Sequence, residues 1–211
     1  AGIEQTPENG FGATPLTKYR RHVLMLHPHT VIVYDELEAS EAVRWEWLLH
    51  SPTEFKIDAV KKTLSTDNKT KGWVAVTQLF GGHVFTLSQT DRFVVPPAIT
   101  GAEYPNQWHL TARVDGCSAT RFLAIIQVGD EAVSIINRDG DTFNVGDWTI
   151  KAVLDASKAP ELTVSHRTEQ AVFSYGTDNP ALNGNFYSRQ YTGSSLLYDE
   201  IDGAYQVVEM T

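Results

Sequence analysis

Hydrophobic and polar residues alternate along most of this chain, and no long stretch keeps the period of an amphipathic helix. Val43, Trp45 and Trp47, for example, alternate with mostly polar neighbours, as expected for a strand with one buried face. About fifteen such runs are separated by turn-forming residues at roughly 8–12-residue spacing. The pattern predicts an all-β fold, a large antiparallel multi-strand β-sandwich of layered sheets in which the C-terminal part could form a smaller sheet.

The domain organisation follows from where this alternation begins. Residues 1–17 are rich in glycine, proline and asparagine and lack periodicity, so we predict a linker there. Residues 18–211 are predicted to form one β-sandwich domain, within which residues from about 150 to 211 could form a smaller sub-sheet. The chain starts with Ala-Gly and without methionine, as an excised domain or a processed fragment would.

The first predicted hairpin places two polar side chains next to each other. Residues 19–27 and 30–37 are predicted strands joined by Pro28-His29, so a short hairpin turn is the simplest connection. If the turn has two residues, His22 lies directly opposite Asp35 on the same face of the sheet. An imidazole and a carboxylate would then lie side by side at the end of an apolar ladder.

Two imidazoles and one carboxylate are a common ligand set for zinc. His22, Asp35 and His50 could supply that set. Residues 38–41 are predicted to form a turn before a strand at residues 43–50, and a simple hairpin there carries His50 toward the opposite end of the first hairpin. That arrangement leaves two alternatives, which are a rival set of His27, His29 and His50, or a simple His22–Asp35 hydrogen bond with an unrelated third histidine.

Other polar and aromatic residues leave two interpretations open. Gln107, His109 and Thr111 share one face of a predicted strand, either as a ligand-binding row or as a solvent-exposed surface. The five tryptophans could stack on sugar rings, but their alternation with polar residues within strands favours core packing. No sequence motif for phosphate binding, dinucleotide binding or a nucleophilic serine is present.

The charge balance narrows the choice of partners. The 17 basic and 26 acidic residues give a net charge of −9, which argues against nucleic acid, because affinity for a phosphate backbone depends on lysine and arginine. The same charge disfavours a polyanionic polysaccharide at long range, although a local basic cleft can override it. No apolar run reaches the roughly 20 residues of a membrane span, so we expect no membrane partner.

Four blocks of the sequence resemble the C-terminal β-sandwich domain of the heparinase II/III-like polysaccharide lyases. The resemblance covers most of residues 19–128, in the blocks YRRHVLMLHPHTVIVYDELEAS, WEWLLHSP, FTLSQTDRFVVPP and NQWHLTARV. In that family a helical toroid precedes the sandwich, and the bacterial enzymes cleave uronate-containing polysaccharides such as glycosaminoglycans by β-elimination. The resemblance implies a periplasmic or secreted protein whose partners are the toroid domain of the same enzyme and an acidic polysaccharide.

The resemblance also implies roles for individual residues. In several relatives two histidines and an aspartate of the sandwich hold a structural metal, usually zinc, and the matching positions here are His22, Asp35 and His50. The catalytic residues that relatives take from the toroid have no counterpart in this chain. We therefore expect the chain to form one wall of the substrate cleft and to be inactive alone.

Some relatives add a catalytic histidine from the strand that bears the first metal ligand. Tyr19, Arg20 and Arg21 precede His22 here instead, so Tyr19 and Arg20 are candidate catalytic residues. Arg20, Arg21 and His109 are candidate substrate-binding residues, because a guanidinium can pair bidentately with a uronate carboxylate.

Two functions from other classes stay open. A self-standing carbohydrate-binding module would need several tryptophans exposed on one face. A small zinc-dependent enzyme would use His22, Asp35 and His50 around an activated water.

Overall fold

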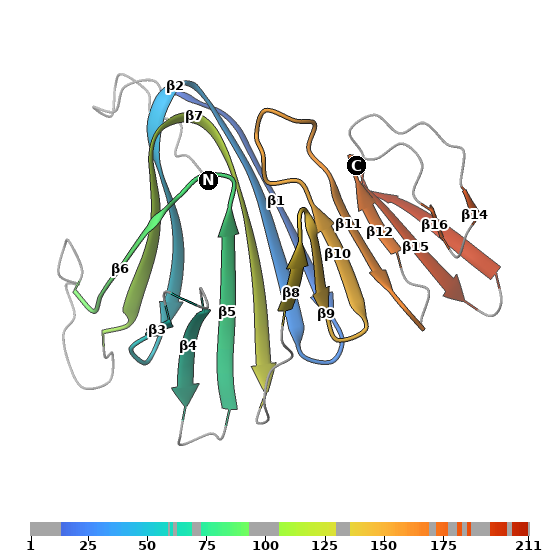
Figure 1. Ribbon diagram of the computed structural model, residues 1–211, viewed down its shortest axis with the longest axis horizontal. Coiled ribbons are helices and arrows are strands. Elements are labelled where there is room, and N and C mark those ends of the chain that lie inside the picture. The colour runs from blue at the N-terminus through green and yellow to red at the C-terminus, as the bar shows by residue number, and fades with distance from the viewer. Residues whose placement is uncertain are drawn as a thin grey trace. The chain divides into compact units, whose positions relative to one another are not determined.

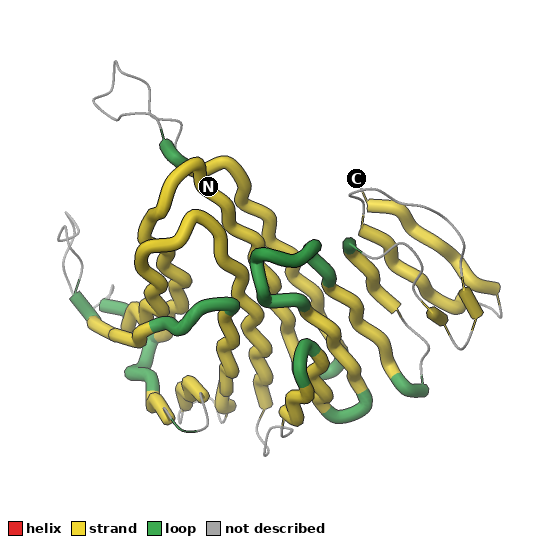
Figure 2. The backbone as a smooth tube through the Cα atoms, turned by 45° about the horizontal axis from the view of Figure 1, so that its top comes forward, coloured by secondary structure: helices red, strands yellow, loops and turns green. Residues whose placement is uncertain are grey.

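The structure is a computed structural model that describes residues 14–58, 60, 63–68, 73–92, 106–129, 136–168, 172–176, 181–182, 185–186, 195–201 and 204–210. The described residues form strands, turns and loops, which confirms the all-β prediction (Figure 1, Figure 2). Among them there is no helix of the length and apolar character needed to cross a membrane. The chain divides into two compact units, Ala1–Val133 and Ser134–Thr211. The predicted linker lies outside the described residues up to position 13, and the first strand starts at Leu16.

A seven-stranded sheet forms the first unit, in the order β1-β2-β7-β5-β4-β3, with β6 paired to β7 off this path. Every neighbouring pair in it is antiparallel. Its strands are β1 (Leu16–Leu26), β2 (Thr30–Ser51), β3 (Lys56–Asp58), β4 (Thr63–Asn68), β5 (Trp73–Gly81), β6 (Thr86–Thr90) and β7 (Trp108–Gly129).

The two longest strands, β2 and β7, have 22 residues each and bend together near their middles. In the first arm, residues 30–38 of β2 pair with residues 119–127 of β7, and in the second arm residues 43–51 pair with residues 108–117. Between the arms the register shifts, and Gly116 takes a positive φ of 73°. Figure 1 shows both strands arching over at this bend, so a single sheet supplies both layers of the sandwich.

The bend corrects three sequence predictions. The predicted turn at residues 38–41 is wrong, because this segment has neither glycine nor proline and the strand continues through a bulge. The alternation also predicts two separate strands at residues 107–114 and 120–128, but residues 108–129 form one continuous strand. Gly81-Gly82 is a predicted hairpin turn, but β5 pairs with the first arm of β7 and β6 with the second arm, so β5 and β6 form no hairpin.

The core of the first unit lies between the two arms. The predicted alternation of residues 43–50 is confirmed, since Trp45 and Trp47 are buried while their even-numbered neighbours are exposed. Removing these apolar side chains from water is the main stabilising term for such a fold. The buried cluster contains Val33, Leu37, Trp45, Trp47, Phe55, Leu64, Leu79, Leu110, Ala112, Val114, Phe122 and Ala124.

The second unit is a separate antiparallel sheet in the order β16-β15-β12-β11-β10-β9-β8, together with a two-stranded pair, β13 and β14. It starts at Ser134, earlier in the chain than the predicted sub-sheet. Its strands are β8 (Ile136–Asp139), β9 (Thr142–Val145), β10 (Trp148–Ala152), β11 (Leu162–His166), β12 (Val172–Tyr175), β13 (Ala181–Leu182), β14 (Asn185–Phe186), β15 (Ser195–Ile201) and β16 (Ala204–Met210).

Candidate functional site

The hairpin of β1 and β2 carries most of the charged residues singled out from the sequence, but its register differs from the predicted one. Leu26 faces Thr30 across a three-residue turn, so Arg21 lies opposite Asp35 and His22 lies opposite Tyr34. The predicted pairing of His22 with Asp35 is therefore wrong by one residue. Because a slip of one residue moves a side chain to the other face of a sheet, His22 and Asp35 lie on opposite faces.

On the face that points to the core, Arg21 forms a bidentate ion pair with Asp35. Nε of Arg21 donates to Oδ1 of Asp35 at 2.6 Å, and Nη2 donates to Oδ2 at 2.8 Å. The Asp35 side chain is 1% exposed and that of Arg21 is 41% exposed. The hydrogen bonds that the guanidinium donates to Asp35 hold the pKa of Arg21 above its usual value, against the effect of partial burial. This geometry fixes the orientation of the guanidinium.

Tyr19 lies beside this ion pair at the edge of the sheet. The carbon of the Arg21 guanidinium is 5.7 Å from the centre of the Tyr19 ring, within the range of a cation–π contact. Tyr19 is 45% exposed, so the ring and the guanidinium are presented together at an exposed edge strand. The structure thus brings together two of the predicted site residues, Tyr19 and Arg21.

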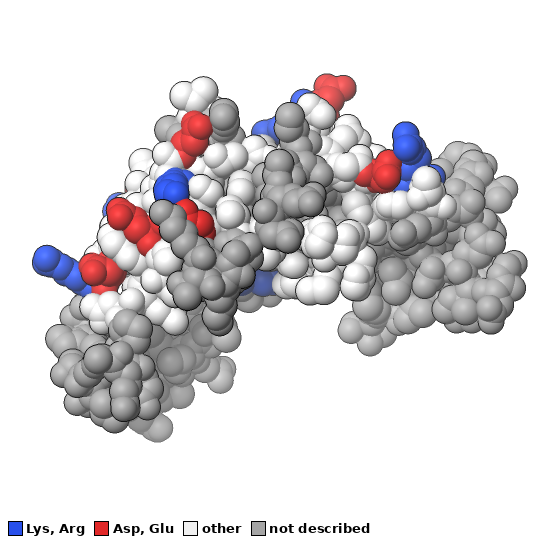
Figure 3. All heavy atoms as spheres, turned by 90° about the horizontal axis from the view of Figure 1, so that it is seen from below, with Lys and Arg blue, Asp and Glu red and all other residues white. Residues whose placement is uncertain are grey.

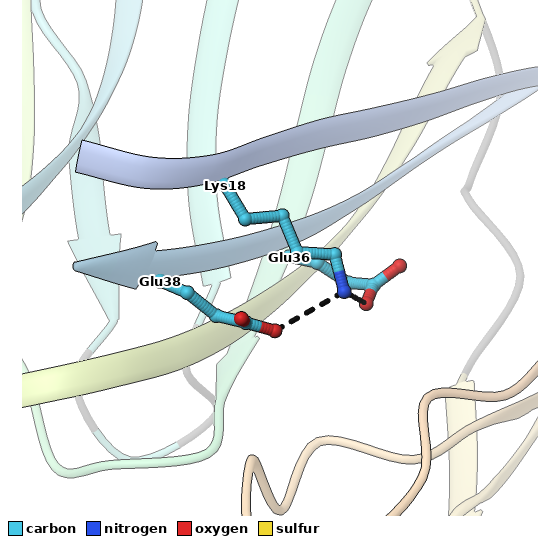
Figure 4. Close-up of polar contacts among 3 residues, drawn as sticks. All are labelled: Lys18, Glu36 and Glu38. Carbon is cyan, nitrogen blue, oxygen red and sulfur yellow. Dashed lines mark hydrogen bonds and ion pairs between the residues drawn. The ribbon is translucent and has the colours of Figure 1, made fainter. Parts of the chain in front are cut away.

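The far face of the same hairpin holds a second set of charges. Nζ of Lys18 donates to Oε2 of Glu36 at 2.8 Å and to Oε1 of Glu38 at 3.1 Å, so the ammonium lies between two carboxylates (Figure 4). Glu36 is 1% exposed and lies opposite Arg20 on β1 and Arg121 on β7. Its Oε1 atom is buried and has no hydrogen-bond partner among the described residues. Burial lowers the pKa of Lys18, but the hydrogen bonds and charges of the two glutamates outweigh it, and the pKa is raised overall.

His22 lies on this far face, next to the buried ring of Tyr34. The two ring centres are 6.3 Å apart. Burial lowers the pKa of His22 below its usual value, and the charge of Glu36 opposes this only in part. The imidazole is therefore mainly neutral at pH 7, the form in which it accepts a proton or a hydrogen bond.

The three residues of the predicted zinc set lie in different places. His22 and Asp35 lie on opposite faces of the first arm, and His50 lies on the second arm, opposite His109. The rival set is not assembled either, because His27 and His29 belong to the turn before β2. Within the described part of the chain, no three His, Cys, Asp or Glu side chains are grouped so that they could hold a metal ion. Zinc binding itself stays a prediction.

The structure brings together His50 and His109, which the sequence left apart. These two residues are a directly opposite pair of β2 and β7, and their rings stack with centres 4.5 Å apart and an interplanar angle of 25°. On its other side His109 pairs with Thr90 of β6. No local pattern predicts this contact, because it depends on the pairing of two strands that are distant in the sequence.

The tryptophans that the structure describes do not form an exposed row. Trp45 and Trp47 are buried in the core, and Nε1 of Trp45 donates to the carbonyl oxygen of Cys117 at 3.0 Å. Trp108 is half-buried against the same core, and half-buried Trp148 makes an edge contact with His166. Core packing accounts for Trp45, Trp47 and Trp108. The exposed row of aromatic rings that a carbohydrate-binding module needs is therefore not seen among these four side chains.

Comparison of the sequence with models of protein families and with curated proteins gives no match. The features that bear on function are therefore the side-chain geometry of the β1–β2 hairpin and the resemblance of the sequence blocks described above.

Proposed function

We propose that this chain is the β-sandwich domain of a polysaccharide lyase that acts on uronate-containing polysaccharide, and that the exposed edge of β1 contributes to one wall of the substrate cleft. The observation that carries the proposal is the fixed arrangement of Tyr19 and Arg21 at that edge. The sequence block that resembles the lyase family supplies both β1 and the first arm of β2.

The edge of β1 has the chemistry that a uronate unit requires. A guanidinium has five N–H donors, and Asp35 takes two of those of Arg21, which leaves three for a sugar carboxylate. The exposed ring of Tyr19 offers an apolar surface against which a pyranose ring can stack. Lys18 and Arg20 lie on the other face of the strand, where Lys18 is paired with Glu36 and Glu38, so Arg21 is the cation that this face of β1 offers to a uronate.

The whole surface is not uniformly basic. Figure 3 shows one face of the molecule on which basic and acidic side chains lie close together. A polyanion would therefore be held by the local cluster on β1 and not by a broad positive field.

β-Elimination on a uronate requires a base that removes the C5 proton, an acid that protonates the leaving oxygen and a group that neutralises the carboxylate. In this proposal Arg21 binds and neutralises the carboxylate, and Tyr19 stacks on the sugar with its phenol group next to the cleft. The proton-transferring groups come from the helical toroid. The chain alone should then bind uronate oligosaccharides without cleaving them.

The test is a calorimetric or NMR titration with acidic oligosaccharides, such as oligomers of glucuronate and mannuronate, and with a neutral oligosaccharide of equal length. We expect binding of at least one acidic series, and Tyr19→Ala and Arg21→Lys should each weaken it about tenfold, or about 1.4 kcal/mol. Arg21→Lys keeps the charge but loses the planar fork that binds carboxylates bidentately.

Arg44→Ala is the matched control, because Arg44 is an exposed arginine of the same sheet that pairs with the exposed Asp115 on the second arm. This variant should bind like the parent. Equal affinity for neutral and acidic oligosaccharides, or equal loss in all three variants, would contradict the proposal. Cleavage by the chain alone, seen as ultraviolet absorbance of an unsaturated product, would contradict the expectation that it is inactive.

A further inference from the structure

The exposed face of the second arm carries two histidines at directly opposite positions of a strand pair, a placement from which both can reach one metal ion. His50 and His109 are directly opposite each other on antiparallel strands, and their rings stack with centres 4.5 Å apart. His50 is exposed and His109 is half-buried, and both lie on the face that points away from Trp45 and Trp47. A cation can therefore approach both rings from solvent.

The spacing of the two backbone positions suits chelation of one cation by both imidazoles. Metal–nitrogen bonds to histidine are about 2.0–2.1 Å long, so two nitrogens at the tetrahedral angle lie roughly 3.4 Å apart. In the stacked pair the nitrogen lone pairs lie in nearly parallel planes, so at least one ring must turn to another rotamer to bind the same ion. The Cβ atoms of directly opposite residues are roughly 5 Å apart, which is close enough for one nitrogen of each ring to reach a shared cation after that turn.

The backbone holds the two positions firmly in place. The pairing of β2 with β7 continues on both sides of the histidines, through Leu49 with Leu110 and Ser51 with Trp108. β6 flanks His109 from the other side through Thr90. Strand pairing fixes both Cα atoms, so folding already meets the entropic cost of bringing the two imidazoles together. This favours binding of one cation by both rings.

We propose that His50 and His109 together bind one divalent transition-metal cation, with water in the remaining coordination positions. Imidazole is a ligand for copper, nickel and zinc, and the order of divalent affinities makes Cu²⁺ the tightest of these. A cation held by only two protein ligands can exchange with free cation in solution, and it keeps open coordination positions for water. This site shares His50 with the predicted set of His22, Asp35 and His50 but pairs it with His109, and it does not depend on the proposed lyase function.

The experiment is a titration of metal-free protein with Cu²⁺, followed by calorimetry and by electron paramagnetic resonance, with Zn²⁺ as a competitor. We expect one tight equivalent per chain with hyperfine coupling to two nitrogens, and a rise in melting temperature on binding. Loss of an outer-shell partner of a metal ligand already lowers affinity about 10- to 100-fold, so His50→Ala and His109→Ala should each weaken binding at least tenfold.

The control is the double variant His27→Ala/His29→Ala, which removes two exposed histidines of the β1–β2 turn and leaves the strand pair intact. It should bind Cu²⁺ like the parent. Melting of the metal-free variants verifies that each is folded, as expected for surface substitutions. The proposal is overturned if the parent does not bind Cu²⁺, if either single variant on the second arm binds as tightly as the parent, or if the turn variant loses the site.

Discussion

The ion pair of Arg21 with Asp35 gives the sharpest test of the register of the first hairpin. In the observed register Arg21→Ala leaves the carboxylate of Asp35, which is 1% exposed, without its two charge-assisted hydrogen bonds. In the register predicted from the sequence, the partner of Asp35 would be His22. The two registers therefore predict opposite orders of stability for Arg21→Ala and His22→Ala.

The size of the effect follows from burial. Removal of one partner from a fully buried ion pair costs about 3–5 kcal/mol, and because Arg21 is 41% exposed and water can take its place in part, we expect about 2–4 kcal/mol. His22→Ala loses packing against Tyr34 and should cost about 1 kcal/mol. A variant with both partners made apolar, Arg21→Met/Asp35→Leu, should regain most of the stability, because Asp35 lies on the same face as Val33 and Leu37.

The assay is equilibrium unfolding in urea followed by tryptophan fluorescence. Four of the five tryptophans, at positions 45, 47, 73 and 108, belong to the first unit, so the signal reports mainly on the sheet that contains the ion pair. With a slope of about 2 kcal/mol per molar urea, a loss of about 3 kcal/mol lowers the midpoint by about 1.5 M. If Arg21→Ala lies within about 0.5 kcal/mol of the parent while His22→Ala is severely destabilised, the observed register is refuted.

Two further predictions concern a proton and a backbone conformation. Burial lowers the pKa of His22 below its usual 6.5, so this ring takes up a proton at a higher pH in the unfolded chain than in the folded chain. The free energy of unfolding therefore falls as the pH drops below about 6.5. His22→Gln should remove this part of the decline in urea unfolding at a series of pH values, and an unchanged profile would contradict the assignment. In the second unit, Gly176 has a φ of +76° and a Cβ atom there would overlap the carbonyl oxygen of Pro160, so Gly176→Ala should cost more than the roughly 1–2 kcal/mol of left-handed strain alone. Gly140→Ala, with a φ of +56° and open space around the position, should cost only that strain, and equal melting temperatures of the two variants would contradict the clash.

Local patterns in the sequence predict the strands well, because alternation with a period of two depends on neighbours along the chain. Alternation in the sequence predicts strands at residues 142–145 and 162–166, and the structure forms both with these bounds. It also predicts the buried alternation around Trp45 and Trp47. The bend of β2 and β7 is not predicted, because a bulge without glycine or proline in one strand looks like a polar turn. The contact of His50 with His109 is missed for the same reason, since it exists only once β2 continues through the bend and pairs with β7.

The register of the first hairpin was open for a different reason. Val23, Leu24, Met25 and Leu26 are four consecutive apolar residues, so the alternation that normally fixes a register is absent there. The length of the turn then decides the register of β1 against β2. From the sequence, a turn of Pro28 and His29 alone is hard to distinguish from one that also includes His27. A difference of one residue in the turn moves His22 away from Asp35 and brings Arg21 to it.

The charges on β1 contain a signal that distinguishes the two registers. In the observed register Lys18 lies opposite Glu38, Arg20 opposite Glu36 and Arg21 opposite Asp35. In the register shifted by one residue, Lys18 would face an alanine and Arg20 a leucine, and only Arg21 among the three cations would face an acid. Opposite charges that face each other across a sheet contribute about 0.2–1 kcal/mol per pair, so the two additional pairs favour the observed register by up to about 2 kcal/mol. The observed register therefore places the carboxylate of Asp35 against Arg21, where it orients the guanidinium that we propose binds a uronate.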